Sequence, residues 1–478
     1  MIFLRTSLMV ALFLCFGGAP LCAQRSFTPQ QVREDLAFLQ EALLHGHPGA
    51  GLYMPADSLR AVFRQLGDRL RGDSIPWAQA QLVIRLAVAA MRDGHTSVQT
   101  PFYDETTRVL PLSTFAVDDA LFVAANHSAD TTLARGTEIT AVDGVPPADV
   151  LRIGRLMATA DGYSLPFRQV YAELMYARLH TLLFGDRDTL AVSVLTPGGG
   201  ARTSRVASID RAALERLTTA HLKALPKGPE PVFRHKTMSV YRDTVRTDLA
   251  VLALRGFPTR GYKKFYRKSF QWMRDNGIRH LGVDLRYNTG GTLKNMNFLL
   301  ASLIPESYSY RYLRKKGAGM GRYFRTKADL QQAMASLRYD VLPGFKRSRE
   351  GDVKVRTRRI KPRKQVFDGN IWVLSNGFTF SAASMSASFL RDRRGAQVIG
   401  QESGGSAERN CGGSFPSLVL PNTGFKVRFP LYLLEYDVAE GPFGRGVLPD
   451  HPVTYTLSDR VARRDVERER LRAILERR

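Results

Sequence analysis

Cysteine is scarce in this chain, with only three in 478 residues. Cys15 and Cys22 lie within the first 23 residues, which read as a removable secretion signal, so Cys411 would be the one thiol of the mature chain. An intrachain disulfide is thereby excluded, and so is a small fold held together by disulfides. Cys411 stands in a Cys-Gly-Gly stretch that matches no thiol-protease pattern, and we interpret it as a bystander.

Long apolar runs are scarce as well. The run near the N-terminus, Leu8 to Phe16, follows a positive Arg5 and precedes a small residue, Ala23. It is too short to span a bilayer. This order of charge, apolar core and small residue predicts a signal peptide over residues 1–23 and an exported protein, periplasmic or extracellular. No other segment is apolar over enough residues to cross a membrane.

Acidic residues are outnumbered: 44 Asp and Glu stand against 69 Lys and Arg, which gives a net charge of +25. The basic residues are dispersed and form no nucleic-acid-binding motif, so we predict no nucleic-acid partner. Such a charge favours peripheral contact with anionic envelope surfaces, or attraction of acidic substrates. Solubility or lineage bias explains the same composition equally well.

Metal-ligand patterns are also missing. His45 and His47 are close together, but no third ligand follows at a useful spacing, and we interpret both as surface or turn residues. We predict no metal and no organic cofactor.

One stretch that is present, Ile371 to Ser406, organises the rest of the chain. Ile371 to Leu374 and Ala396 to Gly400 read as buried strands, and a helical pattern begins at Ser381 between them. A serine at a helix start most often caps the helix, because its oxygen accepts an orphan backbone N–H. The alternative is a nucleophile beside backbone donors that stabilise an oxyanion.

A second strand-to-helix junction lies between Leu281 and Met296. It reads Asp-Leu-Arg-x-Asn and then has two adjacent glycines, Gly290 and Gly291. Paired glycines let the backbone approach a ligand and direct N–H groups toward it. If the two junctions belong to one sheet, they can face each other and supply both halves of an oxyanion hole.

Three motifs in this order resemble the tail-specific, or C-terminal-processing, serine peptidases and their relatives around the tricorn core protease. They are D-L-R-x-N-x-G-G at Asp284 to Gly291, T-x-S-A at Thr379 to Ala382, and a G-Q-E-S-G variant of the third motif at Gly400 to Gly404. The resemblance implies a crotonase-like α/β catalytic domain with Ser381 as nucleophile. It also implies an oxyanion hole made by the N–H of Ala382 and that of Gly290 or Gly291.

The chain departs from the best-known branch, whose base is a Lys 25 positions after the serine, because that position is Ser406 here and no Lys occurs from Gln365 to Phe425. The Glu that the family usually carries in S-A-x-E is Ser384. The proton acceptor must therefore come from elsewhere.

His95 is the residue that we predict as base. It follows a predicted helix over Trp77 to Met91 in the order Asp93-Gly94-His95-Thr96, with Gly94 as the expected helix-capping glycine. This resembles the position of the base in the tricorn-like relatives. We predict Glu440 as the residue that orients His95; Asp93 and Glu435 are the alternatives.

The predicted domains are an N-terminal helical domain over residues 24–104, a β-rich domain over 105–207 and a catalytic domain over 208–478. Gly136 to Gly144 resembles a bacterial PDZ signature, and a helical insert, Ser164 to Leu183, precedes the last strand of that domain. Within the catalytic domain, residues 308–364 form a basic, loop-rich insertion, either a lid or a solvated excursion. A basic helix over 460–478 has no assigned role.

The expected function is that of an exported serine endopeptidase acting on unfolded proteins or C-terminal tails. The alternative is a catalytically inactive peptide- or ligand-binding protein on the same fold, since a fold does not fix a function. Ser384 and Ser406 in place of Glu and Lys favour that alternative, whereas Ser381, His95 and the paired glycines favour activity.

Overall fold

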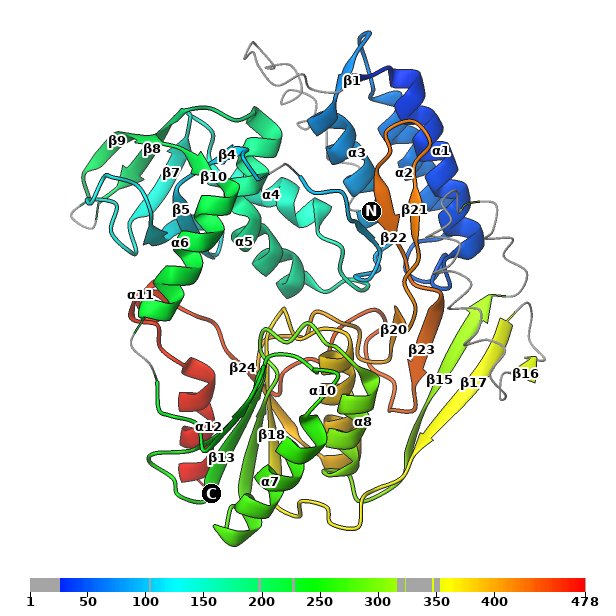
Figure 1. Cartoon of the computed structure of the whole chain (residues 1–478), viewed down its shortest axis with the longest axis vertical. Helices are drawn as coiled ribbons and strands as arrows, with labels where there is room; N and C mark the ends of the chain where they lie inside the picture. Colours follow the sequence, from blue (N-terminus) through cyan, green and yellow to red (C-terminus); the bar gives the residue numbers. More distant parts are fainter. Residues whose placement is uncertain are drawn as a thin grey trace.

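The computed structural model describes residues 26–102, 105–196, 199–225, 228–315, 323, 346–347 and 353–477. The predicted signal peptide and most of the predicted lid lie outside these residues. In Figure 1 the helices near the N-terminus and a smaller sheet form the upper part, and a larger sheet with its helices forms the lower part. No helix in the described ranges combines the length and the apolar character that a membrane span requires.

Three helices follow the N-terminus, in the region predicted as a helical domain. Thr28 and Gln31 form a capping box at the start of the first, which buries Val32, Leu36 and Leu39 at helical spacing. The elements are β1 (Ser26–Phe27), α1 (Pro29–Gly46), α2 (Ala56–Asp68), β2 (Ile75–Pro76) and α3 (Trp77–Ala89).

The capping role predicted for Gly94 is wrong. Helix α3 already ends at Ala89, and the left-handed residue of the turn that follows is Arg92, with φ 54°. Gly94 is needed for another reason, because a Cβ there would lie 2.5 Å from the ring of Phe380. The glycine thus permits close packing against the residue that precedes Ser381.

A five-stranded antiparallel sheet occupies the region predicted as β-rich, in the order β5-β6-β7-β8-β9. The helical insert is present as α5, whereas β5, α4 and β9 were not anticipated. The elements are β5 (Leu112–Val117), β6 (Ala120–Asn126), β7 (Glu138–Val142), α4 (Pro147–Met157), α5 (Leu165–Phe184), β8 (Thr189–Leu195) and β9 (Ala201–Ala207). β4 (Arg108–Val109), β10 (Ile209–Asp210) and α6 (Arg211–Ala224) connect this region with its neighbours.

The lower part is built on a seven-stranded sheet in the order β11-β12-β13-β14-β18-β19-β24. The pairs from β13 to β24 are parallel, as the predicted helical crossovers require. The strands are β11 (Phe233–His235), β12 (Met238–Arg242), β13 (Leu249–Leu254), β14 (His280–Asp284), β18 (Asn370–Ser375), β19 (Gln397–Gly400) and β24 (His451–Pro452). The crossover helices are α7 (Tyr262–Asp275), α8 (Leu293–Ala301) and α10 (Ala382–Arg394).

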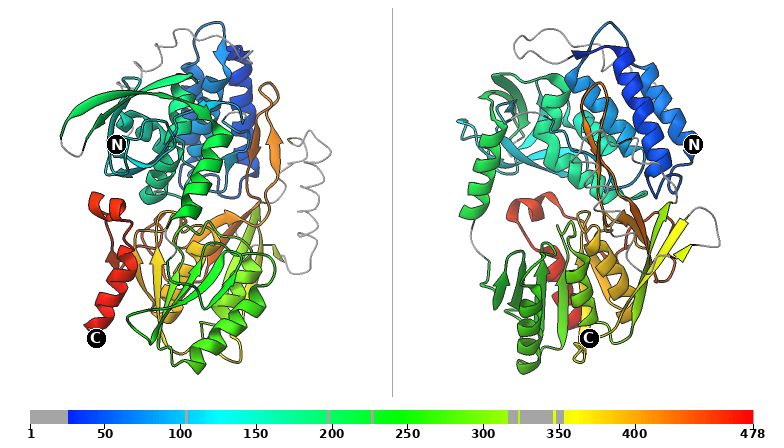
Figure 2. Two further views of the ribbon diagram at one scale, coloured as in Figure 1. Left: turned by 60° about the vertical axis from the view of Figure 1, so that its left-hand side comes forward. Right: turned by 45° about the vertical axis from the view of Figure 1, so that its right-hand side comes forward.

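Both faces of this sheet are covered. Val373 belongs to the cluster that contains residues of α7, α8 and α10, whereas Trp372 and Leu374 pack with Leu471 and Leu475 of α12 (Val466–Glu476). Alternate residues of a strand face opposite sides, so α12 must cover the second face. Figure 2 shows α12, in red, along the outside of the sheet; α11 (Leu457–Ala462) precedes it.

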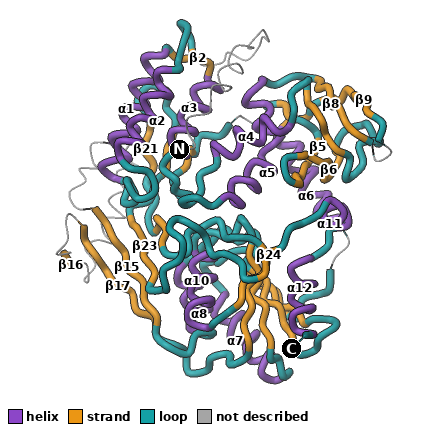
Figure 3. Tube along the Cα trace, turned by 180° about the vertical axis from the view of Figure 1, so that it is seen from behind, coloured by secondary structure: helices purple, strands orange, loops and turns teal. Residues whose placement is uncertain are grey.

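The insertion predicted as loop-rich begins and ends in strands, so this prediction is wrong at both ends. β15 (Tyr308–Lys315) pairs with β17 (Val353–Ile360) and with β23 (Tyr432–Tyr436), in a sheet completed by β16 (Lys346–Arg347) and β20 (Arg409–Gly412). A hairpin of β21 (Ser417–Val419) and β22 (Lys426–Arg428) rises beside the N-terminal helices (Figure 1). Seen from behind, loops gather between the upper and lower parts (Figure 3).

Candidate active site

Ser381 lies between β18 and α10 in a backbone conformation that L-residues rarely adopt, with φ 56° and ψ −125°. Its side chain makes no capping hydrogen bond to the helix. The helix-cap interpretation of this serine is therefore wrong. A sharp, strained turn from strand to helix is the geometry that presents a nucleophilic oxygen above a sheet, although the local G-x-S-x-G sequence is missing.

Hydrogen bonds to the neighbouring strand-to-helix junction hold this turn. The N–H of Phe380 donates to the carbonyl of Asn288 at 2.9 Å, and the hydroxyl of Thr379 donates to the carbonyl of Leu285 at 3.0 Å. The two junctions therefore face each other, as the sequence suggested. Ser381 is placed by the end of β14 as well as by its own strand.

His95 comes from the other end of the chain and reaches Ser381. Its Nε2 lies 2.9 Å from Ser381 Oγ, although the two residues are 286 positions apart in sequence. The turn is followed by β3 (Ser97–Val98), which pairs with β22 of the rising hairpin. Phe380 and Phe415 flank the imidazole, with ring centroids at 4.6 and 5.5 Å. The structure thus brings together the two residues predicted as nucleophile and base.

The surroundings of His95 keep it neutral. Only 6% of the residue is exposed, and burial lowers its pKa to about 4, with the charge of Asp93 opposing the shift and Arg428 adding to it. Nδ1 is buried and has no hydrogen-bond partner among the described residues. A neutral imidazole whose Nε2 faces a hydroxyl can accept the proton of that hydroxyl at neutral pH.

The prediction that Glu440 orients His95 is wrong. Glu440 is exposed and makes no hydrogen bond to His95, whose Nδ1 has no partner within the described ranges. The alternative Glu435 pairs instead with Arg311 at 2.7 Å. Asp93, the other alternative, does lie near His95, and its negative charge acts to raise the pKa of the imidazole.

Asp93 is itself fixed by His47, which the sequence had suggested to be a surface or turn residue. His47 is fully buried, so it is not a surface residue, although it does begin the turn that follows α1. Its Nδ1 accepts the N–H of Gly49 at 3.0 Å, so Nε2 carries the proton and donates to Asp93 at 3.0 Å. Thr96 donates to the same carboxylate oxygen. Burial acts to raise the pKa of Asp93, but His47 lowers it, so Asp93 is an anion.

The N–H groups predicted for the oxyanion hole differ in availability. Gly290 donates its N–H to the side chain of Asn288 at 2.8 Å, so this donor is already engaged. The N–H groups of Gly291 and Ala382 donate to no other group in the described part of the chain. Of the two glycines, Gly291 therefore keeps the free donor.

The residues at the family's Glu and Lys positions have structural contacts. Ser384 donates to the carbonyl of Gly405 at 2.7 Å, and the N–H of Ser406 donates to Asp161 at 3.3 Å. In the third motif, Glu402 is buried and pairs with Arg445 at 2.7 Å. None of these contacts supplies a proton acceptor to Ser381.

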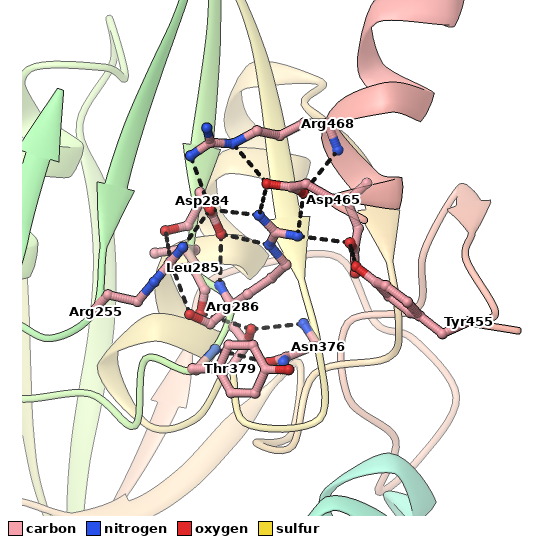
Figure 4. A network of polar contacts seen from close by, with 11 residues as sticks. Arg255, Asp284, Leu285, Arg286, Asn376, Thr379, Tyr455, Asp465 and Arg468 are labelled. Atoms are coloured by element: carbon pink, nitrogen blue, oxygen red, sulfur yellow. Dashed lines mark hydrogen bonds and ion pairs between the residues drawn. The ribbon is translucent and has the colours of Figure 1, made fainter. Parts of the chain in front are cut away.

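A buried ion network supports the junction that faces Ser381 (Figure 4). Asp284 has no exposed surface and pairs with Arg286 at 2.9 Å and Arg255 at 2.7 Å. Arg286 also pairs with Asp465 and Glu467 of the C-terminal segment, each at 2.7 Å. Burial acts to raise the pKa of Asp284, but the two guanidinium groups hold it far below its usual range. The C-terminal segment, which had no predicted role, thus balances the charge of Arg286.

Among the residues that the structure describes, two groups of three side chains are close enough to hold a metal ion in principle. They are His47 with Asp93 and Cys411, and Asp93 with His95 and Asp161, with ligand atoms within 4.8 Å in each group. Both nitrogens of His47 are already committed to hydrogen bonds, and burial raises the pKa of the Cys411 thiol. We interpret the first group as a hydrogen-bonded support for Asp93.

Comparison with known proteins agrees with this arrangement. Residues 248–452 match the model of peptidase family S41. The structure of mature CPAF complexed with lactacystin superposes with a TM-score of 0.62 at 18% identity, covering 93% of this chain and 97% of that chain. A structure of mature CPAF gives a TM-score of 0.57 at 18% identity, covering 91% and 94%. No curated protein matches the sequence.

The structural likeness shows a shared mixed α/β fold over both parts of the chain. The family match runs from β13 to β24, so it contains Ser381 and both glycines, whereas His95 lies outside it. Residues 248–452 are therefore similar to peptidase family S41, a family of serine-type peptidases.

Proposed function

We propose that this protein is an exported serine endopeptidase that hydrolyses peptide bonds in unfolded proteins or C-terminal tails, with Ser381 as nucleophile and His95 as general base. The observation that carries the proposal is the 2.9 Å contact between His95 Nε2 and Ser381 Oγ. The unusual backbone of Ser381 supports it, because such strain persists only where the surroundings impose it.

In the proposed reaction, Ser381 Oγ attacks the carbonyl carbon of the scissile bond while His95 Nε2 takes the hydroxyl proton. The N–H groups of Ala382 and Gly291 stabilise the oxyanion. His95 then gives its proton to the leaving amine, and the C–N bond breaks to leave an acyl-enzyme. A water molecule, deprotonated by His95, hydrolyses the ester. The low pKa of His95 keeps the base in its neutral form at the start of each cycle.

The finer domain assignment is part of this proposal. The parallel sheet with crossover helices fits a crotonase-like catalytic domain, and the five-stranded sheet over residues 112–207 fits a PDZ-like domain that accompanies it. A domain of that kind would take extended chain ends, which is why we propose unfolded proteins and tails as substrates.

Single and double alanine variants test the catalytic pair. Ser381→Ala and His95→Ala should each lower kcat/KM for casein on the order of 10⁴-fold, and the double variant should cost little more, because either loss disables the same step. Ser406→Ala is the control, since its hydroxyl cannot act as a base near neutral pH. Full activity in His95→Ala would refute the assigned base. Absence of Ser381-dependent hydrolysis on every substrate tried would favour the binding protein instead.

The exported location rests on residues 1–23 and has its own test. Cleavage after Ala23 would make Gln24 the first residue of the protein recovered from the cell envelope or the medium. N-terminal sequencing of the recovered protein distinguishes this from a chain that retains Met1, which would contradict export by a cleaved signal.

A further inference from the structure

The segment between α4 and α5 joins the turn that carries His95 to the domain that carries Ser381. Its Asp161 is 2% exposed and accepts two backbone N–H groups: that of Gly94 at 2.8 Å and that of Ser406 at 3.3 Å. We propose that Asp161 is a positioning residue, which holds His95 within reach of Ser381. This inference rests on the proposed function of that pair.

The contact with Gly94 places Asp161 directly behind the base, because Gly94 and His95 share a peptide bond. Asp161 holds Gly94 through its N–H, and the ring of Phe380 packs against the Cα of the same glycine, where a Cβ would lie at 2.5 Å. Phe380 in turn precedes Ser381. The backbone of the base is therefore held between one carboxyl group and the neighbour of the nucleophile.

The residues after Asp161 make further contacts with both the turn that carries His95 and the catalytic domain, and we call residues 161–164 the seam. Gly162 donates its N–H to the carbonyl of Arg92, in the turn of His95, at 2.8 Å. On the opposite side, Tyr163 donates its N–H to the carbonyl of Gly444 at 2.8 Å. Residues 161–163 thus bind the base-carrying turn and the catalytic domain at the same time.

Ser164 ends the seam by donating its hydroxyl to the carbonyl of Ser403 at 3.1 Å. Ser403 lies on the same catalytic-domain loop as Ser406, the second partner of Asp161. The segment between α4 and α5 therefore contacts this loop at two points. Such a seam matters because a base displaced by about 1 Å can cost about 10²-fold in rate.

The charge state of Asp161 fits a positioning role. Its carboxyl group, that of Asp93 and one ring nitrogen of His95 lie within 4.8 Å of one another. Burial and the negative charge of Asp93 raise the pKa of Asp161, which favours the neutral form of this carboxyl group. A neutral acid can accept the N–H of Gly94 without placing a second negative charge beside the base.

Asp161→Ala, Asp161→Asn and a matched control separate this role from general stability. Asp243→Ala is the control: Asp243 is also buried and also accepts two backbone N–H groups, each at 3.0 Å, but it precedes β13, at the end of the sheet opposite Ser381. Asp243 also pairs with Arg472 at 2.9 Å, so its removal is the more demanding test of general stability. Each variant is purified as the full chain, checked for folding, and assayed for kcat and KM on one peptide.

We expect Asp161→Ala to lower kcat by about 10²-fold with KM changed by less than about threefold. Asp161→Asn should stay within about threefold of the wild type, because its amide oxygen still accepts the N–H of Gly94. Asp243→Ala should keep its kcat. Wild-type kcat in Asp161→Ala, or an equal loss in Asp161→Asn and Asp161→Ala, would overturn the proposal.

Two further measurements keep the test decisive. If Asp161→Ala does not fold, Gly162→Ala perturbs the same segment, because a Cβ there would lie 2.2 Å from the carbonyl oxygen of Gly444; unchanged kcat would refute the proposal. A crystal structure of Asp161→Ala, or of Gly162→Ala in its place, reports on positioning even if no hydrolysis is found. Retention of the contact between His95 and Ser381 would overturn the role of Asp161, whereas lack of Ser381-dependent hydrolysis by the wild type would overturn the peptidase instead.

Discussion

Replacement of Arg286 by Met tests what the buried ion network contributes. Arg286 is 7% exposed and donates to both oxygens of Asp284, each at 2.9 Å. It also donates to Asp465 at 2.7 and 3.2 Å and to Glu467 at 2.7 Å. Methionine has a similar length and no charge, so the variant keeps most of the volume and removes only the guanidinium.

The expected loss of stability follows from Asp284 and Glu467, the two buried carboxylates that would lose Arg286 as a partner. Removal of one partner from a buried ion pair costs about 3–5 kcal/mol. Arg255 still pairs with Asp284 at 2.7 Å, so we expect the lower end, about 3 kcal/mol. For a folding unit of about 150–250 residues, a change of 1 kcal/mol in the free energy of unfolding shifts Tm by about 2–4 °C. The variant should therefore melt about 6–12 °C below the wild type.

Calorimetry or circular dichroism at neutral pH measures this shift, and Arg311→Met is the control. Arg311 makes an exposed pair with Glu435, which is worth about 0–1 kcal/mol. The pH dependence of the difference in Tm between variant and wild type gives a second test. The lowered pKa of Asp284 stabilises the native state above the unfolded pKa of about 3.9, and this contribution is lost as the pH falls below it. The difference in Tm should therefore narrow below about pH 4. A shift of less than 2 °C at pH 7 would refute the reasoning.

Three shorter predictions concern the site and the charge. In a plot of kcat/KM against pH, activity should fall at low pH with a pKa near 4, where His95 becomes protonated. Asp93→Asn should lower this pKa, because the negative charge of Asp93 raises it. A pKa near 6.5 in the wild type would contradict the assignment. Glu440→Ala should keep kcat/KM within about twofold, since Glu440 makes no hydrogen bond to His95, and a tenfold loss would restore its predicted role. Raising the salt concentration from about 20 to about 200 mM should raise KM for an acidic peptide more than for a neutral one, because the attraction between the basic protein and the acidic peptide is screened over about 10 Å at 0.1 M. An equal change in KM for both peptides would exclude steering of substrate by the net charge of +25.

The strands and helices around Ser381 could be predicted because their pattern is local. The strand from Ile371 to Leu374 is an unbroken apolar run, typical of a parallel strand covered on both faces. The same reasoning predicted the strand β14 before the paired glycines. It missed β15, in which every second residue from Tyr308 to Tyr312 is a tyrosine, and β17, which is rich in basic residues; both were interpreted as part of a basic, loop-rich insertion.

The predictions that failed required contacts between distant parts of the chain. His47 is a histidine next to a proline, which locally indicates an exposed turn; it does begin a turn, but it is fully buried and contacts Asp93 and Thr96 by hydrogen bonds. Gly94 follows a helix, which locally indicates a cap, yet its lack of a side chain is needed by Phe380. Asp161 carried no signal at all, because a single aspartate between two helices is ordinary in sequence. Its role depends on two backbone N–H groups that folding brings to it.

Ser381 shows why local reasoning about a helix start can mislead. A capping serine needs an extended backbone so that its oxygen can turn toward the following N–H groups. At φ 56° and ψ −125° that oxygen is directed away from the helix and toward His95. Such a conformation costs about 1–3 kcal/mol, which the bond from Phe380 to Asn288 and the bond from Thr379 to Leu285 must offset.

The end of β14 can hold Ser381 only if it is rigid, and this gives the ion network a role apart from stability. A buried ion pair often adds little to stability compared with well-packed apolar side chains, because its charges must be desolvated. Here Asp284 and Arg286 flank Leu285, whose carbonyl accepts the hydroxyl of Thr379. The network fixes the direction of that carbonyl from both sides. We therefore expect Arg286→Met to lower kcat even at temperatures where the variant is fully folded, and a folded variant with wild-type kcat would show that the network serves stability alone.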